Sequence, residues 1–257
     1  MNVPLRAISW AIRFFWMITI AFAITCAYSA TLIRMDFGQP LVQDSQEDLR
    51  ITLPLAFENN GYYTIDDLNI TSIIMHNTTH ISKGTSHVMS IFPQTHSTIL
   101  HNVSLNVNEL VADEYYLFND ADLVLRGSIS LNYAHLIPFK LEGNSSIPWG
   151  APLFNFTLGT IGYTRYNLTH VQANIPIAFQ NHSPYFSVAG DIQIQIFTDR
   201  DQAAGEGTVA VDVPAGRPYT GQIEALMQIT PAAPSGQIHV YFKTATFSHG
   251  PLVVNYG

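Results

Sequence analysis

A short apolar segment that occurs twice constrains the fold of this chain more than any other feature. Leu53–Asn59 (LPLAFEN) returns 122 residues later as Ile175–Asn181 (IPIAFQN), with four of seven positions identical. The match resumes after a one-residue slip, because Tyr62–Ile65 aligns with Tyr185–Val188. An insertion at a turn between matching strands is typical of a duplicated domain. The 257 residues therefore predict two domains of roughly 110 residues each, enough for independent cores.

Apolar residues alternate along both copies of this segment, which predicts strands with one face toward a core. Pro54 and Pro176 hold the same place in the two copies. Because proline cannot donate a ladder hydrogen bond, we expect the strand to lie at a sheet edge or to place its proline at a bulge or beyond the pairing. Short alternating strands with Gly and Pro turns follow. Together they predict an all-β fold of two tandem immunoglobulin-like β-sandwich domains.

Turn-rich segments set the expected boundaries. The three expected parts are an N-terminal cytoplasmic tip with a transmembrane helix (residues 1–35), a first β-sandwich (36–143) and a second β-sandwich (144–257). The irregular elements that we expect are a linker at Met35–Asp48, a polar loop at His76–Ser86, a short helix at Glu109–Phe118, an interdomain linker at Gly143–Gly150 and a turn at Pro231 and Pro234.

The N-terminal segment is apolar enough to cross a bilayer. Phe14–Ile33 contains 20 residues without a charge, and a helix of that length spans the hydrocarbon layer of about 30 Å. Arg6 and Arg13 precede it, which favours an inside N-terminus and outside domains. The alternative is a cleaved signal peptide, with small residues at Ala27 and Ser29. We expect an uncleaved single-pass anchor in the cell membrane, because the apolar run exceeds the about 7 to 15 residues of a signal core.

Glycosylation sequons lie only after this segment. The seven acceptor asparagines are Asn69, Asn77, Asn102, Asn144, Asn155, Asn167 and Asn181. In Phe154–Leu158 the sequon residues alternate with apolar ones, so a strand would turn the asparagine toward water. Pro184 follows the tripeptide of Asn181, which lies in the repeated strand-to-turn element. We expect N-linked glycans on several of these residues.

Composition excludes some partners. Only 12% of the residues are charged, with 11 Lys plus Arg against 19 Asp plus Glu. Nucleic acids and anionic lipid surfaces require clustered basic charge, so neither is an expected partner. Cys26 is the single cysteine and lies in the apolar segment, so the sequence contains no pair for an intrachain disulfide and no cysteine zinc site.

Polar clusters give weak signals for metal binding. The histidines concentrated in the first half are His76, His80, His87, His96 and His101. His76 and His80, four residues apart, share a face of a helix or strand, but a solvated loop explains the set better. The aspartate pairs that could hold calcium are Asp120 with Asp122 and Asp199 with Asp201. Each pair lies where a turn is expected, and aspartate is a common turn residue. We assign no metal ligand.

The sequence also lacks motifs for catalysis. No Gly-x-Ser-x-Gly elbow or phosphate-binding glycine loop is present. Asp66 and Asp67 follow one another and are most simply turn residues, because a glycosidase needs two facing carboxylates. We therefore assign no catalytic and no cofactor-binding residue, and we expect a protein that is not an enzyme.

The repeated strands resemble the late embryogenesis abundant type 2 family, also called the water stress and hypersensitive response domain. That family has an aliphatic strand that runs into an Asn-Pro-Asn triplet. Leu53–Asn59 and Ile175–Asn181 match the strand and its final asparagine, but both copies lack the proline of the triplet. Hairpins that end near Gly143 and Gly257 also fit, so the resemblance covers residues 36–257. It implies immunoglobulin-like sandwiches, often membrane-anchored, and no catalytic residues. The sparse charge and many sequons look like an archaeal surface protein.

Three functions are compatible with these features. The first is a structural or protein-interaction role as an exterior glycoprotein of the cell envelope, or as accessory subunit of a membrane complex or filament. The second is binding of lipid or another hydrophobic ligand in an apolar groove, with Tyr62, Tyr63, Tyr185 and Phe186 as candidate lining residues. The third is stress protection, for example against desiccation, which only the family name implies.

Overall fold

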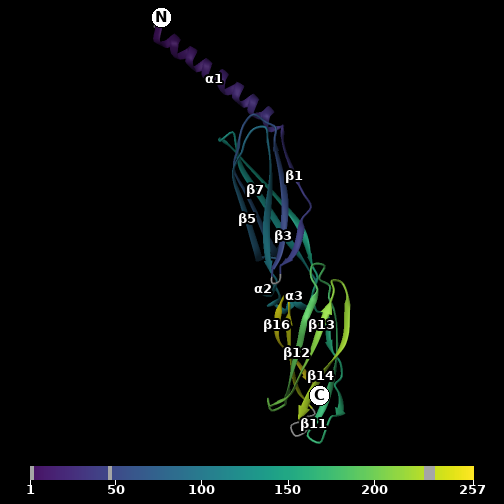
Figure 1. Ribbon diagram of the computed structural model, residues 1–257. Coiled ribbons are helices and arrows are strands. Elements are labelled where there is room, and N and C mark those ends of the chain that lie inside the picture. Colours follow the sequence, from purple (N-terminus) through teal and green to yellow (C-terminus); the bar gives the residue numbers. More distant parts are fainter. Residues whose placement is uncertain (1–2, 46–47, 229–234) are drawn as a thin grey trace.

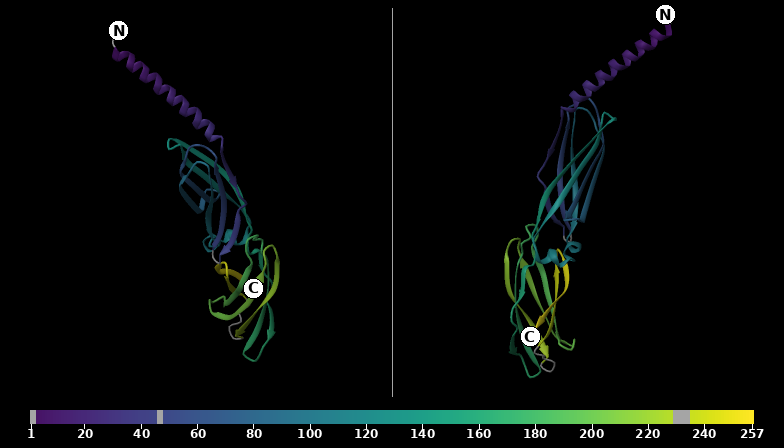
Figure 2. Two further views of the ribbon diagram at one scale, coloured as in Figure 1. Left: turned by 45° about the horizontal axis from the view of Figure 1, so that its top comes forward. Right: turned by 180° about the vertical axis from the view of Figure 1, so that it is seen from behind.

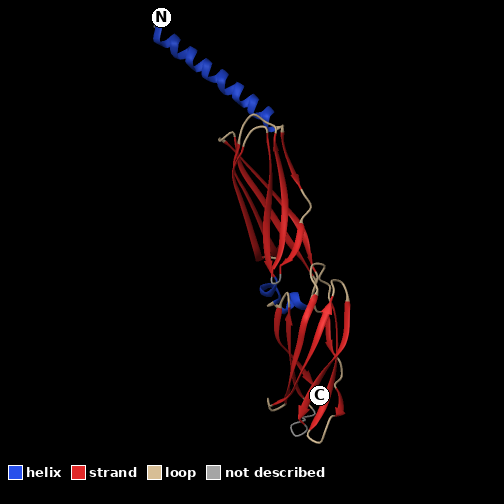
Figure 3. Ribbon diagram, in the orientation of Figure 1, coloured by secondary structure: helices blue, strands red, loops and turns tan. Residues whose placement is uncertain are grey.

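The structure is a computed structural model that describes residues 3–45, 48–228 and 235–257. An N-terminal helix and two β-domains follow one another end to end and give an elongated molecule (Figure 1). The two views in Figure 2 show the same serial arrangement. Colouring by secondary structure shows strands throughout both domains and short helical segments near the junction between them (Figure 3). The predicted all-β sandwich fold after one N-terminal helix is confirmed.

Helix α1 (Val3–Ala30) contains the apolar segment. Its stretch Arg6–Ala30 is long and apolar enough to cross a membrane, a test that an anchor and a signal sequence both pass. The helix ends earlier than the predicted Ile33, because Ile33 already begins the first strand.

The first domain consists of two antiparallel sheets. Its strands are β1 (Ile33–Phe37), β2 (Leu41–Ser45), β3 (Asp48–Asn59), β4 (Ile65–His76), β5 (Thr79–Ile91), β6 (Thr95–Asn106), β7 (Ala121–Tyr133) and β8 (Ile137–Trp149). In one sheet β3 lies between β6 and the pair β1 and β2, and the other has the order β5-β4-β7-β8. Helices α2 (Val107–Val111) and α3 (Glu114–Phe118) connect the sheets, capped by Asn106 and Asp113.

The second domain repeats this topology. Its strands are β9 (Phe154–Leu158), β10 (Gly162–Arg165), β11 (His170–Gln180), β12 (Val188–Thr198), β13 (Ala203–Val213), β14 (Pro218–Gln228), β15 (Gly236–Thr244) and β16 (Ser248–Tyr256). Each strand pairs as its counterpart eight places earlier does, so β11 corresponds to β3 and β12 to β4. In addition β13 pairs briefly with β14, which joins the two sheets at one edge.

Several segments expected to be irregular are strands. The linker predicted at Met35–Asp48 contains most of β1 and all of β2, and the loop predicted at His76–Ser86 is the β4–β5 hairpin with its turn at Asn77. The helix predicted at Glu109–Phe118 is divided into α2 and α3. Gly143–Trp149 pairs with β7, so the first domain extends about to Gly150. Pro231 and Pro234 lie outside the described residues.

The prediction of an edge position for the repeated strand is wrong. β3 is paired on both sides, with β6 along its full length and with β1 and β2 on the other side. Pro54 faces the interruption between β1 and β2, where its carbonyl accepts a hydrogen bond from the Gly38 N–H at 2.9 Å. Pro176 accepts from Gly159 at 2.8 Å in the same way. Each proline therefore lacks its N–H on the side where no strand pairs with it, so no ladder hydrogen bond is lost.

The boundary between the two apolar clusters of the core does not coincide with the boundary between the two domains. One apolar cluster fills the helix-proximal half of the first domain and includes Leu55, Phe57 and Cys26 of α1. A second cluster runs from the far end of the first domain, at Leu49 and Trp149, into the whole second domain. The apolar interior is therefore continuous across the junction of the two domains.

Candidate functional site

A buried asparagine ends the repeated strand in each domain. The Asn59 Nδ2 donates to the carbonyl oxygens of Tyr63 and Ile91 at 2.9 and 3.1 Å, and its Oδ1 accepts from the Gly61 N–H at 3.2 Å. Because these three bonds join one side chain to two loops, Asn59 fixes the shape of the domain end that faces α1.

Asn181 makes the same three hydrogen bonds in the second domain. Its Nδ2 donates to the carbonyl oxygens of Phe186 and Val213 at 3.0 and 3.1 Å, and its Oδ1 accepts from the Ser183 N–H at 3.0 Å. Ser183 and Val213 lie 122 residues after Gly61 and Ile91, the spacing of the repeat. Sequence reasoning treated this asparagine as a turn and a sequon, and missed its structural role.

The first of these domain ends receives the last two turns of α1. Phe22, Cys26 and Ser29 share one helix face by their spacing, and Cys26 and Ser29 are buried. Ser29 Oγ accepts from the Tyr62 N–H at 2.6 Å and from the Tyr133 hydroxyl. Burial raises the pKa of the Tyr133 phenol. We call this contact the helix joint.

Aromatic packing completes the helix joint. The Phe22 ring meets the Tyr63 ring edge-on at a centroid distance of 5.6 Å, and Tyr63 meets Tyr133 edge-on at 6.0 Å. The Tyr63 hydroxyl lies 2.8 Å from the Thr25 hydroxyl. Such aromatic pairs stabilise a contact by about 0.5–1.5 kcal/mol beyond the area that they bury.

The equivalent end of the second domain receives the end of the first domain. Trp149 packs on Phe186 at a centroid distance of 6.0 Å, and Phe186 meets Phe247 at 6.4 Å, which reproduces the order of rings in the helix joint. The His182 N–H donates to the Ala151 carbonyl at 2.9 Å, as the Tyr62 N–H donates to Ser29. We call this contact the domain joint.

Further hydrogen bonds hold the domain joint. The indole N–H of Trp149 donates to the Tyr116 carbonyl in α3 at 2.8 Å, and burial raises the pKa of the Tyr116 phenol. Asp120 accepts from the Ala151 N–H and lies 2.9 Å from the His182 ring. At Gly150 a β-carbon would clash with the His182 carbonyl, so only glycine allows this approach.

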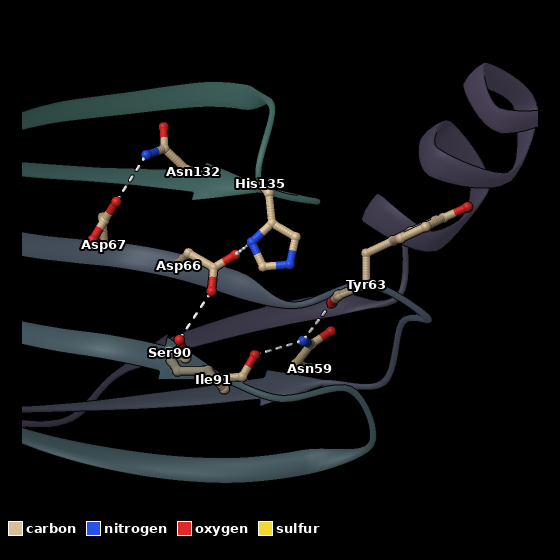
Figure 4. Close-up of polar contacts among 8 residues, drawn as sticks. All are labelled: Asn59, Tyr63, Asp66, Asp67, Ser90, Ile91, Asn132 and His135. Atoms are coloured by element: carbon tan, nitrogen blue, oxygen red, sulfur yellow. Dashed lines mark hydrogen bonds and ion pairs between the residues drawn. The ribbon is translucent and has the colours of Figure 1, made fainter. Parts of the chain in front are cut away.

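A polar cluster lies beside the helix joint (Figure 4). Asp66 Oδ1 accepts from the Ser90 hydroxyl at 2.9 Å, and its Oδ2 lies 2.7 Å from His135 Nδ1. Asp67 accepts from the Asn132 amide at 3.2 Å. These bonds tie β4 to β5, β7 and the turn after β7. Asp66 and Asp67 therefore hold strands together and do not face each other as a catalytic pair.

The first domain also has an apolar groove of about 340 Å³ between its two sheets. The apolar lining residues are Phe37, Leu53, Leu55, Ile70, Leu125, Ile129 and Leu141. Gly127 and Gly143 face each other across β7 and β8 at this groove, and a β-carbon on Gly143 would meet no atom within 4 Å. Glycine inside a strand often marks a place that a ligand or another backbone approaches closely.

The second domain fills the corresponding space. Phe156 of β9 packs edge-on against Phe242 of β15 at a centroid distance of 5.3 Å. By strand pairing, the first domain has Met35 and Ile129 at these places. Of these two residues Ile129 lines the groove, so an aliphatic side chain where the second domain has the Phe242 ring leaves space there.

The aromatic residues predicted to line a groove are elsewhere. Tyr62, Tyr63, Tyr185 and Phe186 follow the repeated strands, so they lie at the ends of the sandwiches and not between the sheets. Tyr63 and Phe186 belong to the two joints. The prediction that these four residues line the groove is therefore wrong.

The predicted glycosylation residues differ in exposure. The exposed acceptors are Asn69, Asn77, Asn102, Asn144, Asn155 and Asn167. The alternation predicted around Asn155 is present, since Phe154, Phe156 and Leu158 are half-buried. Asn181 is fully buried and uses its amide nitrogen in two hydrogen bonds. Its glycosylation is incompatible with this fold, which corrects the prediction for that residue.

The histidines do not gather into one site. His76 contacts the Tyr116 hydroxyl at 2.7 Å near the domain joint, whereas His87 and His96 lie near Asp67 and Glu58 at 3.9 and 3.6 Å. His101 is buried in β6, where desolvation lowers its pKa. Within residues 3–45, 48–228 and 235–257, no group of three or more His, Cys, Asp or Glu side chains could hold a metal ion.

No family model and no curated protein matches the chain. Solved structures similar to it include red sea bream transglutaminase, with 11% identity and a TM-score of 0.29, and the secreted serine protease VesC from Vibrio cholerae, with 9% identity and a TM-score of 0.30. The matches cover 85% and 89% of this chain, but only 30% and 52% of those chains. The resemblance to the water stress and hypersensitive response family stays a prediction.

Proposed function

We propose that the chain is a membrane-anchored exterior glycoprotein whose two sandwiches form a stalk with a structural or protein-interaction role in the cell envelope. The helix joint carries this proposal. Cleavage near Ala30 would remove Phe22, Cys26 and Ser29, and would uncover the rings of Tyr63 and Tyr133. A segment packed into the core in this way favours a retained anchor over a removed signal peptide.

The N-terminus of the mature protein tests the anchor. We expect protein purified from native membranes to keep the residues before Phe22, as read by intact mass and N-terminal sequencing. A mature chain that starts near Ala30 would overturn the proposal. Orientation follows from Arg6 and Arg13 ahead of the span, and is tested by protection of the two domains from protease added on the inner side.

Glycosylation is a second part of the proposal. Six exposed acceptors on the outer domains support it. We expect the mass of the native protein to fall after glycan removal, and Asn102→Gln to lose the mass of one glycan. Asn60→Gln is the control and leaves the glycan mass unchanged, because Asn60 is exposed but belongs to no sequon. An unshifted mass after glycan removal would refute this part.

Free strand edges offer a route to assembly with other proteins. β8 ends its sheet, so its outer edge carries backbone groups over 13 residues, with exposed side chains at Phe139 and Leu141. Such an edge can add a strand from a neighbour. We expect stoichiometric protein partners to accompany the chain out of native membranes in mild detergent. Recovery of a bare monomer would count against this role.

The groove supports a second candidate function, binding of a hydrophobic ligand. Its volume lies near the low end of the range of about 300–1,000 Å³ for ligand pockets. We expect the full chain to bind an apolar fluorescent probe, and Ile129→Phe, which adds a ring to the lining of the groove, to weaken that binding. Equal binding by this variant would show that the probe occupies another surface.

A further inference from the structure

Three turns surround the helix joint and are bonded to one another. They connect β3 to β4 (residues 60–64), β5 to β6 (92–94) and β7 to β8 (134–136). The Gln94 side chain donates to the Asn60 carbonyl at 2.7 Å, and the Ala134 N–H donates to the Thr64 carbonyl at 3.0 Å. The turns therefore form one end surface of the first domain, beside the end of α1 (Figure 1).

Each turn presents a large apolar side chain to solvent. Tyr62 is 61% exposed, Phe92 63% and Leu136 73%. Tyr28 in the last turns of α1 stacks on Tyr62, which continues the apolar surface of the helix onto the domain. A cluster of exposed apolar residues on one end of a domain marks a surface that another apolar phase covers.

The repeated fold does not require these side chains. In the second domain Tyr185 corresponds to Tyr62, because Asn181 bonds to the Phe186 carbonyl as Asn59 bonds to the Tyr63 carbonyl, and Tyr185 is half-buried. Pro214 and Gly250 stand near the places of Phe92 and Leu136. Large apolar side chains exposed at all three turns therefore occur at the end that faces the helix and not at the end that faces a domain.

The length of α1 places this end near the bilayer. The part of α1 without a charge, Phe14–Ala30, has 17 residues, about 26 Å of helix at 1.5 Å per residue, against a hydrocarbon layer of about 30 Å. With Arg13 at the inner boundary of that layer, the end of α1 therefore lies at its outer boundary, next to the headgroups. Because Tyr63 packs on Phe22, two turns before the helix ends, the first domain reaches the depth of this layer.

We propose that Tyr62, Phe92 and Leu136 form a membrane-contact face that lies in the headgroup layer of the outer leaflet. This inference rests on the proposed anchoring of α1. Aromatic and aliphatic tips partition into that layer without basic charge. The acidic side chains near these turns, Glu58, Asp66 and Asp67, lie next to His96, His135 and His87, so these charges do not select anionic headgroups.

Quenching by lipid tests this proposal in the full chain. In a Cys26→Ala background, single cysteines are placed at Leu136, Phe92, Ile18 or Tyr166 and labelled with a fluorophore. Ile18 lies on the exposed surface of α1 and reports anchoring. Tyr166, with the same 63% exposure as Phe92, lies in the second domain far from α1 and is the matched control. The labelled proteins are reconstituted in phosphatidylcholine vesicles whose acyl chains are brominated near their upper ends.

We expect the labels at Ile18, Phe92 and Leu136 to lose fluorescence in brominated vesicles, and the label at Tyr166 to keep it. Quenching at Ile18 with Phe92 and Leu136 as bright as Tyr166 would overturn the contact face and leave the anchor intact. An unquenched label at Ile18 would overturn both the anchor and the inference that rests on it.

Discussion

The two sandwiches share their strand order and their joint, but they differ in how their interiors are filled. The second domain closes its core with Phe156 against Phe242, where the first domain leaves a groove of about 340 Å³. The first domain also buries His101 where strand pairing places Ile223 in the second. The second domain packs two rings at this place, whereas the first keeps open space and a buried histidine.

This difference shows which part of the repeat is constrained. The loop after the repeated strand receives a neighbour in both copies, although the neighbour is an apolar helix in one and a β-domain in the other. Asn59 and Asn181 fix that loop with the same three hydrogen bonds. The joint is therefore the feature that both copies share, and it arranges α1, the first domain and the second domain in series.

Removal of Trp149 tests the domain joint and should have the largest effect. Trp149→Ala is expected to lower the free energy of unfolding by about 3–5 kcal/mol, as for other buried aromatic residues. The helix joint offers the comparison, because Phe22 is only half-buried and Phe22→Ala should cost less. Chemical denaturation followed by circular dichroism measures both. Equal losses would show that the two joints are not packed as described.

Removal of the buried asparagines tests whether the two domain ends are equivalent. Asn59→Ala and Asn181→Ala each leave two buried carbonyls without a donor, so we expect each to lose about 2–3 kcal/mol of stability. Asn60→Ala is the control at an exposed neighbour and should change little. A large loss in one domain with none in the other would break the correspondence.

Filling the groove should make the first domain more like the second. Ile129→Phe places a ring in the lining of the groove, where the second domain has Phe242, and is expected to raise stability by about 0.5–2 kcal/mol, the usual range for cavity filling. The midpoint of thermal unfolding measures the gain. Destabilisation would mean that the groove has no room for the ring, and that the domains do not differ in filling.

The pH dependence of stability distinguishes the domains by a smaller effect. Desolvation lowers the folded-state pKa of His101 below its ordinary value of 6.5, so the unfolded chain binds the proton more readily. Stability therefore falls as the pH drops below 6.5 toward that lowered value. His101→Ile, which copies Ile223, should flatten this dependence in thermal unfolding between pH 7.5 and 5. An unchanged slope would assign the pH effect to other groups.

The sequence predicts the features that follow from apolar patterning. Leu55 and Phe57 alternate inward, and the duplication of their strand implies two sandwiches. The strands β1, β2 and the Gly143–Trp149 part of β8 differ from the prediction because they lie at sheet edges and their described side chains are largely exposed, so they show little alternation. Such strands form because their backbone pairs with a neighbour, and one-dimensional patterning does not contain that partner.

The joints could be predicted only in part. The apolar N-terminal segment is evident in the sequence. The sequence does not show, however, that the helix face with Phe22, Cys26 and Ser29 is the one that packs on the first domain, because other faces of this helix are also apolar. The prediction of a glycan at Asn181 is wrong because the sequon tripeptide is the same whether its asparagine faces water or is buried in a turn. The groove is related to the difference in volume between Ile129 and Phe242, which is evident only after the strands are aligned in space.

Thiol reactivity at Cys26 tests the central claim, that α1 is retained and docked on the first domain. Cys26 is buried in the helix joint, whereas its neighbour Ala27 is exposed on the helix surface. In detergent-solubilised full chain, we predict slow maleimide labelling of Cys26 and fast labelling of a Cys26→Ser/Ala27→Cys variant at the same depth. Equal rates at the two positions would contradict the docked helix and, with it, the serial arrangement of anchor and domains.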